Sequence, residues 1–150
     1  MFSGFDTLNN NNELPEQFKP YYDYVRSIDP RYNQVVVNWY ENKHDHIAYH
    51  SDCEIGMIPD HEITIISLYS ASLPRGSDND GSDESRSLPE RTISFVSKEG
   101  VDSIYDKVNI CTKHGQIITM CGDIQSKFRH GIEPTQTDVL PRISLSFRQY

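Results

Sequence analysis

Two histidines, one aspartate and a strand bounded by arginines are the parts of this chain that could do chemistry. His50 and Asp52 stand two positions apart, and His130 follows eighty residues later. Because side chains alternate across a strand, His50 and Asp52 point the same way if that stretch is extended. Two imidazoles and one carboxylate can hold Fe(II) on one face and leave the opposite positions open for a co-substrate and O2. The spacing therefore predicts oxygenase chemistry.

The segment 142–148 supports this prediction independently. Its sequence, Arg-Ile-Ser-Leu-Ser-Phe-Arg, alternates polar with apolar side chains and predicts a strand with one polar and one apolar face. The polar face carries Arg142, Ser144, Ser146 and Arg148. The Cα atoms of the two arginines would lie about 20 Å apart, so their side chains could approach opposite ends of a dicarboxylate but not clamp one carboxylate. An ordinary surface strand would turn the same polar face to water.

A second polar pair ends the valine-rich segment 33–40, whose β-branched residues predict a buried strand. Asn38 and Tyr40 share a parity on this strand, so an amide and a phenol emerge on the same side. Both groups can donate hydrogen bonds to a carboxylate. A strand end that turns polar before a loop would show the same pattern.

One helix followed by many short strands makes up the predicted fold. The stretch 14–28 has a helical pattern, and its aromatic residues Phe18, Tyr21, Tyr22 and Tyr24 are expected to pack on a sheet. Strands are predicted at residues 33–40, 47–51, 63–69, 92–98, 108–112, 116–121, 128–133 and 142–148. This order favours a mainly β (α+β) domain: a double-stranded β-helix, or jelly-roll-like barrel, with the N-terminal helix packed on it.

Length and composition predict one domain over residues 14–150. A chain of 150 residues with 36% hydrophobic content can bury a sizeable core. The Asn-rich opening, residues 1–13, is expected to be flexible, and the Ser/Asp/Gly-rich stretch 74–90 is expected to be a mobile insertion. No stretch approaches the roughly 20 apolar residues that cross a bilayer, and the N-terminus lacks signal-peptide features. We therefore expect an intracellular protein, cytoplasmic or nuclear.

Charge and cysteine content restrict the partners. Phosphate-binding proteins typically have a basic face, whereas this chain has a net charge of −8. The charge is unevenly distributed along the chain, because residues 1–90 carry −10 and residues 91–150 carry +2. Nucleic-acid binding is thus permitted but not demanded. Three cysteines without a Cys-x-x-Cys motif indicate neither a disulfide framework nor a four-thiolate zinc site.

Several short motifs follow one another along about residues 32–148. They are Asn-Gln-Val-Val-Val-Asn-Trp-Tyr at 33–40, Asp-His-Ile at 45–47, His-Ser-Asp-Cys-Glu at 50–54, Ile-Ser-Leu at 66–68, Gly-Gln-Ile-Ile-Thr-Met at 115–120, Gly-Asp-Ile-Gln at 122–125, His130 and the final Arg-x-Ser-x-Ser-x-Arg. Together these motifs are far more specific than any one of them. In this order they resemble the catalytic core of the AlkB-type Fe(II)/2-oxoglutarate dioxygenases.

The resemblance implies roles for individual residues. Iron would be ligated by His50, Asp52 and His130. The residues that would hold 2-oxoglutarate are Asn38, Tyr40, Arg142 and Ser144, with Arg142 on the carboxylate far from the metal and Arg148 toward the metal end. Glu54 matches the acidic position that contacts the target base in members acting on methylated adenine or cytosine. An anion there favours a cationic methylated base.

The implied reaction is oxidative demethylation of N-methylated bases in nucleic acid, using Fe(II), 2-oxoglutarate and O2 and releasing succinate, CO2 and formaldehyde. The implied partner is methylated DNA or RNA, either single-stranded or with the target base flipped out of the stack. Only about thirty residues precede Asn33, which is fewer than the family's nucleotide-recognition lid needs. The choice among DNA, RNA and another substrate therefore stays open.

Three alternatives remain at the level of sequence. The chain could be a non-catalytic binding or regulatory protein of the same fold, or a dioxygenase that hydroxylates a protein side chain or a small molecule. His44 and His46, together with His50, also place three imidazoles within seven residues, which zinc could bind. The zinc interpretation leaves His130 and the arginine-bounded strand without a role.

Overall fold

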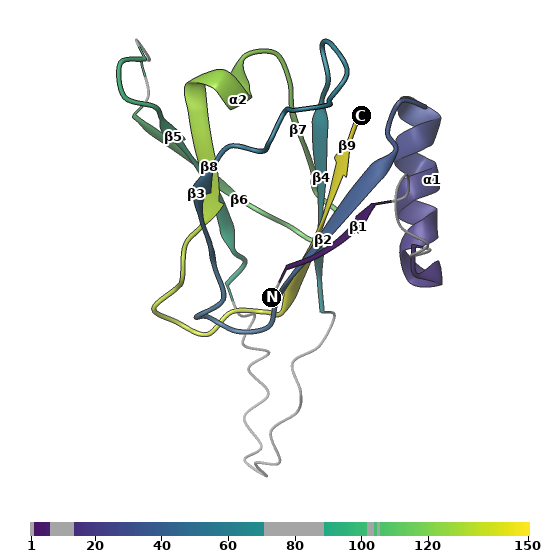
Figure 1. Ribbon diagram of the computed structural model, residues 1–150. Helices are drawn as coiled ribbons and strands as arrows, with labels where there is room; N and C mark the ends of the chain where they lie inside the picture. The colour runs from purple at the N-terminus through teal and green to yellow at the C-terminus, as the bar shows by residue number, and fades with distance from the viewer. Residues whose placement is uncertain (1, 7–13, 71–88, 102–103, 105) are drawn as a thin grey trace.

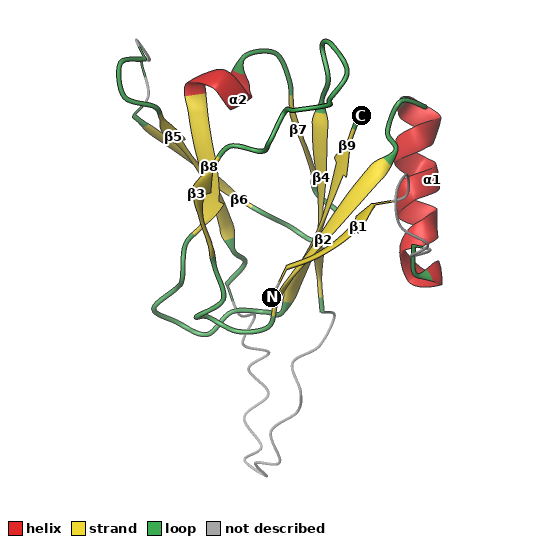
Figure 2. Ribbon diagram, in the orientation of Figure 1, coloured by secondary structure: helices red, strands yellow, loops and turns green. Residues whose placement is uncertain are grey.

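Two antiparallel sheets face each other in the computed structural model, and a helix covers the outer face of one of them (Figures 1 and 2). The structure describes residues 2–6, 14–70, 89–101, 104 and 106–150. The elements in chain order are β1 Phe2–Asp6, the 3-10 turn η1 Glu16–Phe18, α1 Lys19–Ile28, β2 Gln34–Tyr40, β3 Ile47–His50, β4 Ile63–Tyr69, β5 Thr92–Ser97, β6 Lys107–Cys111, β7 Ile117–Met120, α2 Ile124–Lys127, β8 Phe128–Ile132 and β9 Arg142–Arg148.

The chain passes back and forth between the two sheets. The larger sheet has the order β1-β2-β9-β4-β7 and the smaller one β3-β8-β5-β6. Most strands that follow one another in sequence, such as β2 and β3 or β8 and β9, therefore lie in opposite sheets, whereas β1 and β2, and β5 and β6, are neighbours in one sheet. Each described strand pair is antiparallel. This is the double-stranded β-helix that the sequence predicted, with α1 packed on it.

Two apolar clusters lie on opposite faces of the larger sheet. Between that sheet and α1 pack Leu14, Val25, Tyr32, Val35, Val37, Ile66, Leu145 and Phe147. Between the two sheets pack Tyr40, Ile63, Ile65, Ile93, Phe95, Met120 and Ile132. The alternation predicted for β9 is confirmed, because Leu145 and Phe147 are fully buried on the α1 side. Full burial of a side chain of this size stabilises the fold by about 1.5–3 kcal/mol.

The N-terminal helix is shorter than predicted, and one of its aromatic residues does not pack. A 3-10 turn precedes α1, which begins at Lys19 with a proline in its first turn. Phe18, Tyr21 and Tyr22 contact the cluster under the helix, but Tyr24 is 52% exposed. At 3.6 residues per turn, position 24 lies on the opposite side from position 22. The expectation that Tyr24 belongs to the packed stripe is therefore wrong.

Two short elements were not predicted. The backbone of β1 pairs with β2 along the edge of the larger sheet, within a segment that was expected to be flexible. Such an edge strand gains backbone hydrogen bonds without an alternating apolar pattern that would reveal it. The single turn of α2 is likewise too short to show a helical period. Most of the predicted insertion 74–90 lies outside the described residues.

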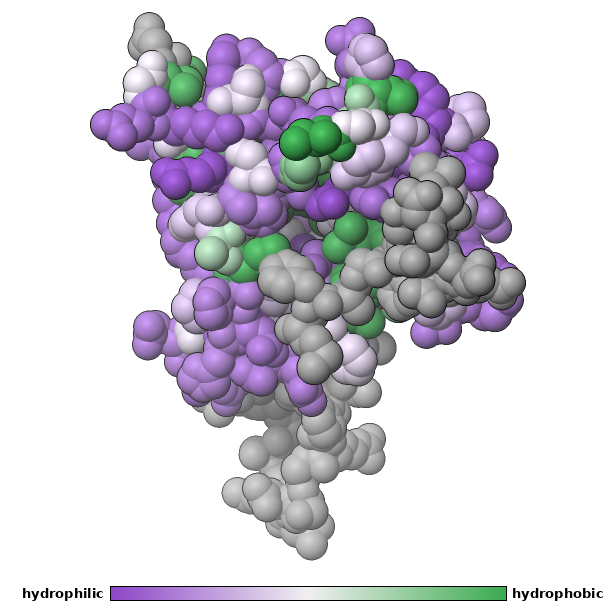
Figure 3. Space-filling view, in the orientation of Figure 1, coloured by the Kyte–Doolittle hydropathy of each residue, from purple (hydrophilic) through white to green (hydrophobic). Residues whose placement is uncertain are grey.

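The face of the molecule shown in Figure 3 is largely polar. Most of its described side chains are hydrophilic, and the hydrophobic ones form small separate groups. None of the helices in the described part of the chain is long and apolar enough to cross a membrane.

Candidate metal centre

The pairing of β3 with β8 brings two histidines together. His50 lies directly opposite His130 in the antiparallel ladder, and their ring centroids are 4.5 Å apart. Asp52 follows the end of β3, with Oδ1 at 3.9 Å from Nε2 of His50 and Oδ2 at 3.7 Å from Nε2 of His130. Ligand atoms of the three residues all lie within 4.8 Å of one another. The structure thus brings the three predicted metal ligands together.

Both imidazoles can present a lone pair at this point. Nδ1 of His50 donates to the carbonyl oxygen of Ala48 at 2.8 Å, which leaves Nε2 as the free nitrogen. Burial lowers the pKa of His130 from 6.5 to about 4, and the neighbouring His50 adds to this effect although Asp52 opposes it. A neutral imidazole is the form that binds a metal. His50 also carries the backbone hydrogen bond that typically orients a metal-bound histidine.

Two donors from different elements hold the carboxylate of Asp52, whose side chain is 5% exposed. Nη2 of Arg148, at the end of β9, donates to Oδ1. Nε2 of Gln125, in α2, donates to Oδ2 at 3.2 Å. The hydroxyl of Ser51 donates to the carbonyl oxygen of Phe128 at 3.1 Å. The resemblance implied that Arg148 lies toward the metal end of the site, and its side chain contacts Asp52 there.

A cavity of about 670 Å³ opens in front of these three residues, between the two sheets. Two strands of the larger sheet line it with alternate residues: Val36, Asn38 and Tyr40 from β2, and Arg142, Ser144, Ser146 and Arg148 from β9. From the smaller sheet, β3 contributes Ile47, Ala48 and His50, and β8 contributes His130, Gly131 and Ile132. The predicted metal ligands and all five residues predicted to bind the co-substrate line this one cavity. The polar face of β9 therefore faces a cavity rather than bulk water.

Arg142 lies in the cavity wall and is 1% exposed. Its Nη2 donates to Oγ of Ser67 at 2.9 Å, whereas Nε and Nη1 have no hydrogen-bond partner among the described residues. Oδ1 of Asn38, in the same wall, also has none. Burial lowers the pKa of Arg142, but a guanidinium remains charged near neutral pH. Unpaired buried donors cost free energy, so this wall of the cavity fits an anion such as a carboxylate.

Arg91 lies behind the cavity wall, against Tyr40, and the sequence did not reveal this contact. It is fully buried and donates to the carbonyl oxygens of Asp45, Asn42 and Lys43, at 2.6, 3.3 and 3.3 Å. Its guanidinium carbon lies 5.2 Å from the ring centroid of Tyr40, and that of Arg142 lies 5.3 Å from the same ring. An isolated arginine ahead of a strand gives no signal in a single sequence.

The phenol of Tyr40 meets the cavity in its neutral form. Burial raises the pKa of Tyr40, although the nearby Arg142 opposes this shift. A protonated phenol can donate a hydrogen bond to an anion that enters the cavity. The guanidinium groups of Arg91 and Arg142 also lie over its ring, at distances that allow cation–π attraction.

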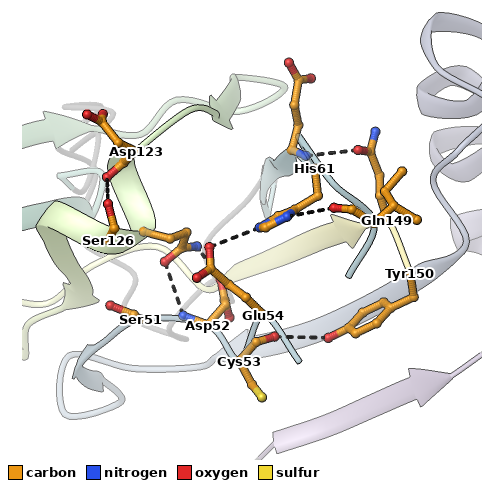
Figure 4. Close-up of polar contacts among 12 residues, drawn as sticks. Ser51, Asp52, Cys53, Glu54, His61, Asp123, Ser126, Gln149 and Tyr150 are labelled. Atoms are coloured by element: carbon orange, nitrogen blue, oxygen red, sulfur yellow. Dashed lines mark hydrogen bonds and ion pairs between the residues drawn. The ribbon is translucent and has the colours of Figure 1, made fainter. Parts of the chain in front are cut away.

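Glu54 and His44 lie outside the cavity lining, whereas His46 lines the cavity without joining the group of possible metal ligands. The carboxylate of Glu54 contacts Nε2 of His61 at 3.1 Å, and Glu54 does not line the cavity, whereas its neighbour Cys53 does (Figure 4). A role for Glu54 at the substrate stays a prediction. Among the described residues, the group of possible metal ligands contains neither His44 nor His46, which weakens the zinc interpretation.

Comparisons with known proteins agree with the fold. No family model and no curated protein matches this chain. Among solved structures, a crystal structure of a Pseudomonas putida prolyl-4-hydroxylase matches with a TM-score of 0.51 and 11% sequence identity. The match covers 99% of this chain and 71% of that chain. At such low identity the likeness concerns the fold alone, and the resemblance to the AlkB type stays a prediction.

Proposed function

We propose that this protein is an Fe(II)- and 2-oxoglutarate-dependent dioxygenase. One observation carries the proposal: His50, Asp52 and His130 converge in the wall of a cavity that also contains the buried, partly unpaired Arg142. Two imidazoles and a carboxylate on one side suit Fe(II) with open positions, and a buried guanidinium suits a dicarboxylic keto acid. The fold likeness to a hydroxylase is consistent with this function.

Different residues of the chain would hold the metal, bind the co-substrate and limit the access of water. His50, Asp52 and His130 would hold Fe(II), which with 2-oxoglutarate supplies the oxidising chemistry when bound. Arg142, oriented by Ser67, would bind the carboxylate of 2-oxoglutarate that is far from the metal. Further hydrogen bonds to the co-substrate would come from Asn38, Tyr40 and Ser144. Apolar side chains in the cavity wall, namely Ile65, Ile93 and Ile132, would limit the access of water to the reacting groups.

For the substrate we propose an N-methylated base in DNA or RNA, because the ordered motifs resemble those of the AlkB type. One atom of O2 would enter succinate and the other the N-methyl group, whose hydroxymethyl product loses formaldehyde, while 2-oxoglutarate loses CO2. A base in a duplex would have to be flipped out to reach the cavity. To meet a cationic base, the carboxylate of Glu54 would have to leave His61.

A second candidate is hydroxylation of a protein side chain. It is favoured by the fold likeness to a prolyl-4-hydroxylase and by the engagement of Glu54 with His61 outside the cavity lining. The acidic balance of the chain, −8 overall, also suits a substrate other than nucleic acid.

Turnover assays on the whole chain separate these candidates. Succinate and formaldehyde are measured with Fe(II), 2-oxoglutarate and O2, in the presence of single-stranded oligonucleotides containing N1-methyladenine or N3-methylcytosine, their unmethylated counterparts, or proline-containing peptides. We expect methylated oligonucleotides to stimulate the formation of both products. His130→Ala should abolish this formation, whereas His44→Ala, at an exposed histidine, should leave it unchanged.

Other outcomes each contradict a defined part of the proposal. Succinate stimulated by peptides without formaldehyde would favour the protein hydroxylase. Binding of Fe(II) and 2-oxoglutarate without turnover on any substrate would favour a non-catalytic binding protein. Turnover that survives in His130→Ala would contradict the metal centre itself.

A further inference from the structure

Gln125 makes two hydrogen bonds to Asp52, although the two residues stand 73 positions apart. Its Nε2 donates to Oδ2 of Asp52 at 3.2 Å, and its Oε1 accepts the backbone N–H of Asp52 at 3.3 Å. One buried amide, 5% exposed, therefore contacts both the main chain and the carboxylate of a single residue. This reciprocal contact restrains the position and the orientation of the Asp52 side chain together.

Asp52 depends on such a contact because no strand fixes it. The strand β3 ends at His50, and residues 51–54 have no regular secondary structure. The β3–β8 ladder also loses its regular register between Ile47 and His50. Side-chain donors must therefore position the carboxylate, and each oxygen has one: Arg148 at Oδ1 and Gln125 at Oδ2.

The segment that carries Gln125 is itself well anchored. Ile124 and Phe128, on either side of it, pack against the apolar cluster between the sheets. Nζ of Lys98 donates to the carbonyl oxygen of Gln125 at 2.6 Å. The strand β8 begins directly after α2 and carries His130. One continuous segment thus supplies the third proposed metal ligand and the side chain that orients the second one.

We propose that Gln125 is a positioning residue of the metal centre: it holds the carboxylate of Asp52 toward the space between His50 and His130. Groups that orient a metal ligand in this way typically change metal affinity by about 10- to 100-fold when they are replaced. This inference rests on the proposed metal centre. A purely structural role for Gln125 would affect stability without affecting the metal.

The test compares two variants with a matched control. Gln125→Met keeps the length of the side chain and removes both hydrogen bonds to Asp52. Gln125→Glu keeps an acceptor for the backbone N–H but places a second carboxylate against Oδ2. The control is Ser126→Ala in the same helix, because Ser126 is exposed and its Oγ contacts the carbonyl oxygen of Asp123 rather than Asp52 (Figure 4).

Co(II) serves as a spectroscopic probe for the Fe(II) site in each full-length variant. Visible absorption gives its affinity and its coordination, and thermal melting gives the stability of the metal-free protein. We expect Gln125→Met and Gln125→Glu to bind Co(II) about 10- to 100-fold more weakly and with an altered visible spectrum. Ser126→Ala should match the wild type in both respects.

Two results would overturn the inference in distinguishable ways. If the wild type binds one Co(II) in a manner that requires His130, but Gln125→Met shows unchanged affinity and spectrum, Gln125 has no positioning role. A fall in the melting temperature alone would likewise exclude that role. If the wild type binds no Co(II), both the metal centre and the inference fail. If Gln125→Met does not fold, the Co(II) affinity and visible spectrum of Gln125→Glu, whose side chain is close to isosteric with glutamine, decide the question.

Discussion

Arg142 is a charged residue placed where charge is costly. Its side chain is almost fully buried, and two of its three nitrogens have no partner among the described residues. Burial of an unpaired guanidinium is unfavourable, so the binding of an anion at this site lowers the free energy of the protein. The alternation of residues 142–148 predicted which face of the strand carries the arginine, but not that this face is buried. The burial of this face depends on how closely the opposite sheet packs against it, and no local sequence pattern encodes that distance.

Replacing Arg142 should separate co-substrate binding from metal binding. Arg142→Ala removes one partner of a buried charge pair, which typically costs about 2–5 kcal/mol and hence at least about 30-fold in affinity. We expect 2-oxoglutarate to bind at least that much more weakly in calorimetric titrations, while Co(II) affinity stays within a factor of about two of the wild type. Arg129→Ala, an exposed arginine on β8, controls for the loss of one positive charge. Equal 2-oxoglutarate affinity in the two variants would refute the role of Arg142.

At the scale of elements, the pairing of β3 with β8 determines the metal centre. Gly131 lies between His130 and Ile132 in β8, and a Cβ atom added there would come within 2.8 Å of the carbonyl oxygen of Ile47. The two strands can approach as they do because this position has no side chain. The glycine is therefore part of the geometry that sets His50 opposite His130.

Gly131→Ala should weaken the metal centre by moving β3. The clash is with backbone atoms, so the strand must shift; overpacking of this kind typically costs about 1–3 kcal/mol of stability. We expect weaker Co(II) binding together with a lower melting temperature. The control is Leu145→Ala, which removes a core side chain on the α1 face and should cost about 2–5 kcal/mol without changing Co(II) affinity. Unchanged Co(II) binding in Gly131→Ala would show that the close strand approach is not needed.

The elements differ in how far the sequence revealed them. The valine-rich β2 and the alternating β9 have strong two-residue patterns, and both form with the predicted side chains facing the cavity. The single turn of α2 has no comparable pattern, so the orienting contact of Gln125 was not predicted. Its motif, residues 122–125, was nonetheless part of the family resemblance and marked this segment as notable. Arg91 had no such signal.

At the scale of the whole molecule, the larger sheet serves two purposes on its two faces. One face packs on α1 through Leu145 and Phe147, and the other lines the cavity through Arg142 and Ser144. The number and order of short strands predicted this fold class. The register that sets His50 opposite His130 could not be predicted from one sequence, because pairing between strands eighty residues apart is decided by the packing of the whole domain.

Near the end of the chain, Gln149 connects the segment after β9 to Asp29, which follows α1. Hydrogen bonds from Arg31, with a further one from Gln149, lower the pKa of Asp29 from 3.8 to about 2. The folded pKa is below the unfolded one, so the contribution to stability is complete above about pH 4 and disappears as the pH falls through about 2. Gln149 is fully buried and connects Asp29 with the backbone N–H of Glu62.

Asp29→Asn should therefore destabilise the protein in a pH-dependent way. We expect a lower urea midpoint than the wild type near neutral pH, and a difference that shrinks as the pH falls from about 4 to about 2. Equilibrium unfolding followed by circular dichroism at several pH values measures this difference. Asp23→Asn in α1 is the control, because Asp23 is exposed and outside this network. A difference between Asp29→Asn and the wild type that is constant over this pH range would contradict the account.

Anaerobic titration of the whole chain with Fe(II) and then 2-oxoglutarate, followed by visible absorption, tests the central claim most directly. A keto acid chelated to Fe(II) absorbs visible light, whereas neither component alone does so appreciably. We predict one Fe(II) per chain, a visible band that appears only after 2-oxoglutarate is added, and loss of that band in His130→Ala but not in His44→Ala. Absence of the band in the wild type, or its persistence in His130→Ala, would contradict a metal centre built from His50, Asp52 and His130.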